Sequence, residues 1–78
     1  MPKRIYVGNL PSTATSREIE AMFTSYGRVT LVQIEGQGRS RFATVEMVND
    51  IEADSAIAGL HNTRMGTVML NVNEARPR

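Results

Sequence analysis

The sequence contains no cysteine and no tryptophan, and it has a single histidine among its 78 residues. The lack of cysteine excludes a disulfide framework and thiolate metal sites, and one histidine cannot build a histidine metal cluster. No apolar stretch approaches the roughly 18 residues of a membrane-spanning helix. The start of the chain, with Lys3 and Arg4 before a short mixed segment, does not resemble a signal peptide. These absences predict a cytoplasmic protein that has no cofactor and does not enter membranes.

What the chain does contain is ordinary for a small folded domain. The hydrophobic fraction is 41% and the charged fraction is 22%, which favours a folded core over disorder. A chain of this length holds one domain and buries only about 60% of the surface that its unfolded form exposes. We therefore expect one domain over residues 1–78, with its core at about 4–75 and a short basic tail at 76–78.

The first half of the sequence reads as strand, helix, strand. Ile5–Val7 and residues 29–34 are rich in β-branched and aromatic side chains and are predicted strands. Between them, apolar residues at i, i+3, i+4 and i+7 predict one helical face. These residues are Ile19, Met22, Phe23 and Tyr26. Thr15 and Glu18 have the spacing of a capping box, and Gly27 is expected to end the helix as a left-handed cap.

The second half repeats this pattern. Residues 42–48 and 68–72 are predicted strands, and the helix between them is expected to begin with the cap formed by Asn49 and Glu52 and to end near Gly59. Its apolar face consists of Ala53, Ala56, Ile57 and Leu60. The order is therefore βαββαβ, and right-handed crossovers place both helices on the same face of one sheet. We predict an α+β, ferredoxin-like two-layer sandwich with a four-stranded antiparallel sheet and one open sheet face.

Alternation along the strands decides which side chains this open face carries. Ile5 and Val7 are predicted to point into the core, so Tyr6 points out, and the same argument places Phe42 outward. Two neighbouring aromatic rings offer flat surfaces on which unpaired bases stack, for about 1–3 kcal/mol each, although such a pair can also simply stabilise the sheet. Thr44 and Glu46 also alternate outward, as do the amides Gln33, Asn71 and Asn73. The predicted contacts to base edges come from Gln33, Thr44, Asn71 and Asn73, although such side chains can also simply remain solvated.

The net charge of +1 hides an uneven distribution of charge. The helices and their caps carry −4, and the remainder of the chain carries +5. Arg39 and Arg41 flank the hairpin between the second and third strands, and Arg76 and Arg78 follow the last strand. Arginines at these places can hold phosphates across an aromatic surface. The predicted pool of phosphate contacts is Lys3, Arg4, Arg39, Arg41, Arg76 and Arg78.

Together these residues resemble the RNA recognition motif family. Residues 5–10 match the hexamer of that family, which reads aliphatic, aromatic, aliphatic, any residue, Asn, Leu. Residues 40–47 resemble its octamer, with clean matches at Phe42, Ala43 and Val45. The βαββαβ order and the spacing of the two motifs fit as well, so the resemblance extends over nearly the whole chain. It resembles in particular small bacterial proteins that consist of a single such motif.

The resemblance implies roles for individual residues. Tyr6 and Phe42 correspond to the aromatic residues that stack on bases, and Thr44 stands where the family has a second octamer aromatic that contacts sugars. We therefore expect weaker binding than a complete motif provides. Ser40 stands at the basic position of the octamer and Arg41 at its glycine. Arg41 has inward alternation, but it lies at the start of a strand and is expected to turn out to solvent.

The resulting prediction is a bacterial, monomeric protein that binds single-stranded RNA and has no small-molecule substrate, with single-stranded DNA as an alternative ligand. Acylphosphatases share this architecture, but they hold phosphate with an arginine in the loop after the first strand. Residues 8–14 contain no basic residue, so we do not predict an enzyme. A protein-interaction module that binds peptides remains the alternative function. Binding of RNA should weaken steeply with added salt, and an apolar peptide contact should not.

Overall fold

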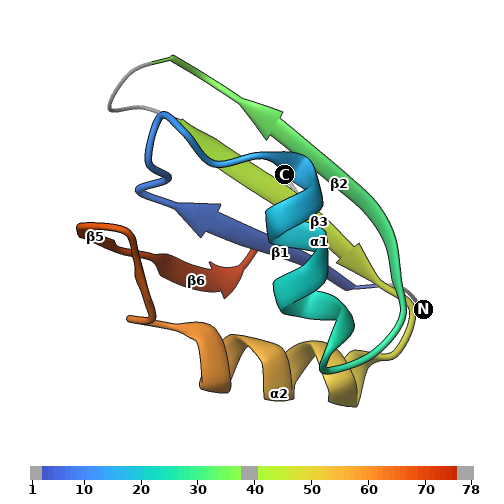
Figure 1. Ribbon diagram of the computed structural model, residues 1–78. Helices are drawn as coiled ribbons and strands as arrows, with labels where there is room; N and C mark the ends of the chain where they lie inside the picture. The colour runs from blue at the N-terminus through green and yellow to red at the C-terminus, as the bar shows by residue number, and fades with distance from the viewer. Residues whose placement is uncertain (1–2, 38–40, 76–78) are drawn as a thin grey trace.

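Two helices lie against one face of a four-stranded antiparallel sheet in the computed structural model, which describes residues 3–37 and 41–75 (Figure 1). The helices are α1 (Ser16–Thr24) and α2 (Asp50–Leu60). The strands of the sheet lie in the order β2 (Val29–Glu35), β3 (Phe42–Met47), β1 (Lys3–Gly8) and β6 (Asn71–Glu74). The α+β, ferredoxin-like sandwich is therefore confirmed, with β1 and β3 at the centre of the sheet.

Both helices begin at the predicted caps. The Thr15 hydroxyl accepts a hydrogen bond from the Glu18 N–H at 3.2 Å, and the Glu18 carboxylate accepts one from the Thr15 N–H at 3.0 Å. The Asn49 side-chain oxygen accepts from the Glu52 N–H at 2.9 Å. Each bond satisfies an amide that the first turn of a helix leaves without a partner. Neither described helix is long and apolar enough to cross a membrane.

The end of α1 differs from the prediction. The helix ends at Thr24, and Gly27 is not in the left-handed region, so the predicted left-handed cap is wrong. Gly27 has a different reason to be glycine, because a β-carbon there would collide with the Glu52 side chain, whose Cδ would lie 2.7 Å away. Glycine at this position allows α2 to approach the turn that follows α1.

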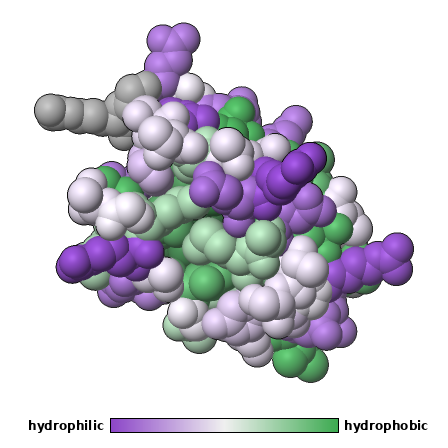
Figure 2. Space-filling view, in the orientation of Figure 1, coloured by the Kyte–Doolittle hydropathy of each residue, from purple (hydrophilic) through white to green (hydrophobic). Residues whose placement is uncertain are grey.

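The core lies between the sheet and the helices, and the predicted inward alternation is confirmed. On the sheet side the fully buried residues are Ile5, Val7, Ala43, Val45, Met47, Leu70 and Val72. The helices contribute Ile19, Phe23, Ala53, Ala56 and Leu60. Leu10 and Ala14 of the loop between β1 and α1 also belong to the core. On the helix side of the molecule, polar and charged side chains surround a smaller apolar area (Figure 2).

The predicted last strand over residues 68–72 is wrong in its first part. Val68–Met69 forms β5, which pairs with β4 (Arg64–Met65) in a separate two-stranded hairpin. Leu70 then separates β5 from β6, because its N–H donates to the Thr63 carbonyl at 2.9 Å and its carbonyl accepts from the Asn62 N–H at 2.9 Å. The sheet pairing of β6 with β1 therefore begins only at Asn71.

Candidate nucleic-acid interface

One row of side chains crosses the whole open face of the sheet. The register pairs Gln33 with Thr44, Thr44 with Tyr6, and Tyr6 with Asn73, so the row runs over β2, β3, β1 and β6. Tyr6 is 40% exposed, Gln33 and Asn73 are exposed, and Thr44 is half-buried. Asn71, one outward position before Asn73 on β6, is exposed as well. The outward alternation predicted for these residues is confirmed.

The two aromatic side chains of the open face lie side by side. The ring centroids of Tyr6 and Phe42 are 5.5 Å apart, and their planes are inclined by 30°. The Tyr6 ring leans along β1 and lies across Gly8, where a β-carbon would be 2.7 Å from its Cε2 atom. Gly8 was not singled out from the sequence. The sequence does offer a signal for this role of Gly8. Residues two apart on a strand share a face, so a glycine two residues after an outward aromatic leaves room for its ring.

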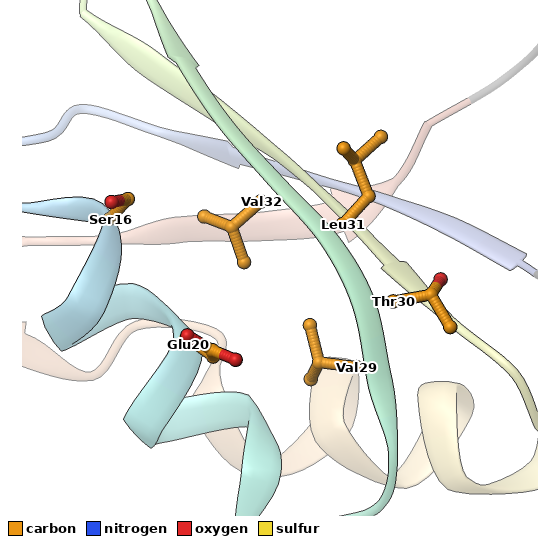
Figure 3. A pocket seen from close by; sticks show the side chains of 6 residues that line it. All are labelled: Ser16, Glu20, Val29, Thr30, Leu31 and Val32. Carbon is orange, nitrogen blue, oxygen red and sulfur yellow. The ribbon is translucent and has the colours of Figure 1, made fainter.

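A bulge in β2 sets the orientation of Gln33. Val29 pairs with Met47, and the next pairing joins Leu31 to Glu46, so Thr30 is the extra residue. Without the bulge, Val29 and Gln33 would share a face. Figure 3 shows Val29 and Val32 directed toward α1 and Leu31 on the other side of the β2 ribbon. The bulge thus turns Leu31 and Gln33 to the open face while both valines face the core.

The pocket in Figure 3 lies between α1 and β2, although the side chains of Thr30 and Leu31 from its lining lie on the other side of the β2 ribbon. It measures about 170 Å³, and Ser16, Glu20 and residues 29–32 line it. It contains none of the predicted stacking or base-edge residues. The candidate interface is therefore the open surface of the sheet, which suits an extended ligand better than a small molecule.

Arg4 is the member of the predicted phosphate pool that the structure places on the open face. Its side chain is 64% exposed, and its Nε donates to Glu46 Oε1 at 3.3 Å. Among the described residues of this face, the charged side chains are one cation, Arg4, and two carboxylates, Glu35 and Glu46. Arg39, Arg76 and Arg78 lie outside the described residues. The described strands therefore do not form a basic surface by themselves.

Lys3 lies on the helix side of β1, because it alternates with Arg4. Its ammonium group contacts Asp54 of α2 at 2.5 Å and Glu74 of β6 at 3.4 Å, and its side chain is 20% exposed. The hydrogen bond to the Asp54 carboxylate raises the pKa of Lys3 above its ordinary value, and Glu74 acts in the same direction. Lys3 thus joins α2 to the edge strand and is directed away from the open face.

The expectation that Arg41 turns out to solvent is wrong. Its guanidinium donates to the carbonyl oxygens of Pro11 at 3.0 Å, Ser12 at 2.6 Å and Ala14 at 3.2 Å. The inward alternation of this residue carries its side chain to the loop between β1 and α1, where three carbonyls offer better partners than solvent. Arg41 therefore stabilises the loop and is not positioned for a phosphate on the open face.

Two further polar residues hold the edge of the interface in place. Asn9 adopts a φ of 63°, and its side-chain amide donates to the Met69 carbonyl at 2.7 Å, which joins the end of β1 to β5. His61 is exposed, and its Nδ1 accepts from the Val72 N–H of the edge strand β6 at 3.1 Å. The first contact holds the segment just before Asn71, and the second holds β6, which carries Asn71 and Asn73.

Comparison with known proteins agrees with this arrangement. The family model for the RNA recognition motif matches residues 5–68. The chain is 44% identical to RbpD of Nostoc sp., a protein named for RNA binding, over 95% of this chain and 83% of that protein. It is 37% identical to a chloroplastic 28 kDa ribonucleoprotein of Spinacia oleracea, over 96% of this chain and 35% of that protein. It thus spans most of the Nostoc relative and about a third of the spinach one.

Solved structures show the same fold. The crystal structure of RNA-binding protein PG1 aligns with a TM-score of 0.88 at 32% identity, covering 97% of this chain and 96% of that chain. The Sxl-lethal protein in a complex with RNA aligns with a TM-score of 0.90 at 27% identity, covering 100% of this chain and 49% of that chain.

Proposed function

Because the chain belongs to the RNA recognition motif family, we propose that it binds single-stranded RNA on its open sheet face, with Tyr6 and Phe42 stacking on bases. The observation that carries this proposal is the pair of rings 5.5 Å apart on a face that no described helix covers. The ligand is single-stranded because bases must leave a duplex stack before they can lie on the rings. The domain, with its core at about residues 4–75, acts in the cytoplasm and without catalysis.

Polar residues on both sides of the rings supply contacts to base edges. Gln33 and Thr44 extend the row from Tyr6 toward β2, and Asn73 extends it toward β6. Asn71 pairs with Gly8, beneath the Tyr6 ring. The amides donate and accept hydrogen bonds, so they can bind either kind of group on a base edge.

Phosphate contacts come from Arg4 and from Arg39, Arg76 and Arg78. Each phosphate neutralised by a protein cation contributes about 0.7 to the slope of log affinity against log salt for a single strand. Four arginines therefore give a slope of at most about 3. Lys3 is left out of this group because it lies on the helix side of the sheet against Asp54, and Arg41 because its guanidinium is held by loop carbonyls.

The test is the affinity of Phe42→Ala for a pool of short single-stranded RNAs, measured by fluorescence anisotropy. Loss of one stacking ring should weaken binding by about 1–3 kcal/mol while the domain stays folded. Ile51→Ala is the matched control, since Ile51 is a 76% exposed apolar residue on α2. Wild-type affinity in Phe42→Ala would refute the stacking role. A loss of RNA binding in Ile51→Ala alone would place the RNA contact on the helix side and contradict the proposal.

A further inference from the structure

A carboxylate is held firmly on the open face, next to the row that contains Tyr6. Glu46 Oε1 accepts from Arg4 Nε at 3.3 Å. The Thr30 hydroxyl lies 3.0 Å from Glu46 Oε2 and 3.2 Å from the Glu46 carbonyl oxygen, and it shares its one proton between them. The Glu46 side chain is 23% exposed. Both oxygens are therefore anchored from one side, and each keeps a second lone-pair direction for another donor.

Glu46 lies at the centre of a second row. The register pairs it with Arg4 on β1 and with Leu31 on β2. Outward residues two apart on a strand are about 7 Å apart, so this row lies one nucleotide-sized step from Thr44 and Tyr6. The Tyr6 ring leans the other way, across Gly8. The half-buried Leu31 supplies an apolar contact beside the carboxylate.

A carboxylate on a surface that receives a polyanion needs an explanation. An Arg–Glu cross-strand pair can simply stabilise a sheet. Here the β2 bulge also turns Thr30 toward Glu46, so that its hydroxyl orients the second carboxylate oxygen. A sheet pair does not require an oriented carboxylate, whereas recognition of a planar group does.

We propose that Leu31, Glu46 and Arg4 form a base subsite beside the aromatic pair, that Glu46 selects guanine there, and that Arg4 contacts the adjoining phosphate. This inference rests on the proposed binding of RNA. An ionised carboxylate only accepts hydrogen bonds. The guanine edge presents two neighbouring donors, N1–H and the N2 amino group, which match the two carboxylate oxygens. Uracil presents one donor between two carbonyl oxygens. It can therefore form only one hydrogen bond with the carboxylate, and its carbonyl oxygens repel the carboxylate oxygens.

Inosine separates recognition of the guanine edge from general electrostatic attraction to RNA, because its base, hypoxanthine, is guanine without the N2 amino group. The experiment measures, by fluorescence anisotropy, the affinity of the full chain for a short uridine RNA with one central guanine and for the same RNA with inosine. The wild type should prefer guanine by roughly ten-fold. In Glu46→Gln the preference should fall to about two-fold or less, because the side-chain amide offers one acceptor in place of two.

Glu35→Gln is the matched control. It removes the same charge from the same face, at the β2 position that pairs with Phe42. Its affinity for both RNAs should change by the same factor, which leaves the preference intact. Equal wild-type affinity for guanine and inosine, or an unchanged preference in Glu46→Gln, would overturn the subsite while leaving RNA binding in place. No wild-type binding to either RNA would overturn the proposed function itself.

Discussion

The Tyr6 ring lies across the α-carbon of Gly8, with its hydroxyl oxygen 2.9 Å from the place that a β-carbon at residue 8 would occupy. The absence of a side chain at Gly8 therefore determines where the ring lies. It lets the ring lean along β1 until its centroid is 5.5 Å from that of Phe42. The aromatic pair of the proposed interface thus depends on three residues, of which one contributes only space.

Gly8→Ala should displace the Tyr6 ring and weaken RNA binding by about 1 kcal/mol, part of the value of one stacked base. The measurement is RNA affinity by anisotropy, with the free energy of unfolding measured in parallel. Gly66→Ala is the control, because Gly66 has a φ of +64° and open space around it. That variant should lose stability and keep its affinity. An unchanged affinity in Gly8→Ala would show that the ring position does not matter.

Thr44→Phe should strengthen binding. Thr44 lies between Gln33 and Tyr6 on the open face, at the position where the family carries its second octamer aromatic. A ring there adds a surface for the ligand, worth on the order of 1 kcal/mol or more. Calorimetric titration with the same RNA compares it with Thr44→Val, which changes polarity without adding a ring. Equal affinities of the two variants would contradict the stacking account at this position.

Arg41→Gln should destabilise the fold by about 1–3 kcal/mol, because its guanidinium holds three carbonyl oxygens of the loop before α1. Chemical denaturation measures this loss, and Arg17→Gln on the exposed side of α1 is the control. The salt dependence of RNA binding should not change in Arg41→Gln. A slope lower by about 0.7 would instead assign a phosphate contact to this arginine.

The contact of Lys3 with Asp54 should make stability depend on alkaline pH. The pKa of Lys3 is raised above 10.5 in the folded state, so the folded protein holds this proton more tightly than the unfolded chain. The contribution is fully present below the unfolded pKa and is lost as the pH rises through the folded pKa. The difference in unfolding free energy between wild type and Lys3→Met should therefore shrink above about pH 10.5. A constant difference would mean that the ion pair is not responsible.

Local patterns predicted much of this fold. The caps at Thr15 and Asn49 and the alternation of Ile5, Tyr6 and Val7 are decided by residues close in sequence, so short-range rules suffice. The sequence also predicted that Tyr6 and Phe42 are neighbours, because their two strands are the central ones in the βαββαβ topology. The predicted stacking and base-edge roles on this face remain proposals.

The differences arose where distant residues compete for a group. The sequence predicts that Arg41 faces solvent, but the loop carbonyls of Pro11 and Ser12 come within its reach only in the folded chain. The sequence predicts a left-handed cap at Gly27, whereas the close approach of the Glu52 side chain, from the other helix, explains the glycine. The hydrogen bonds of Leu70 with residues 62 and 63 likewise interrupt a strand that looks continuous in sequence. Contacts between residues far apart in the chain leave no recognisable pattern in a short stretch of sequence.

We propose above all that the open sheet face binds single-stranded RNA. The most direct measurement is an amide-resolved NMR titration with a pool of short single-stranded RNAs at low and moderate salt. Binding on the sheet should give shifts concentrated at Tyr6, Phe42, Thr44, Asn71 and Asn73, which become smaller as salt is added. Shifts confined to α1 and α2, or no shifts at any RNA concentration, would contradict it.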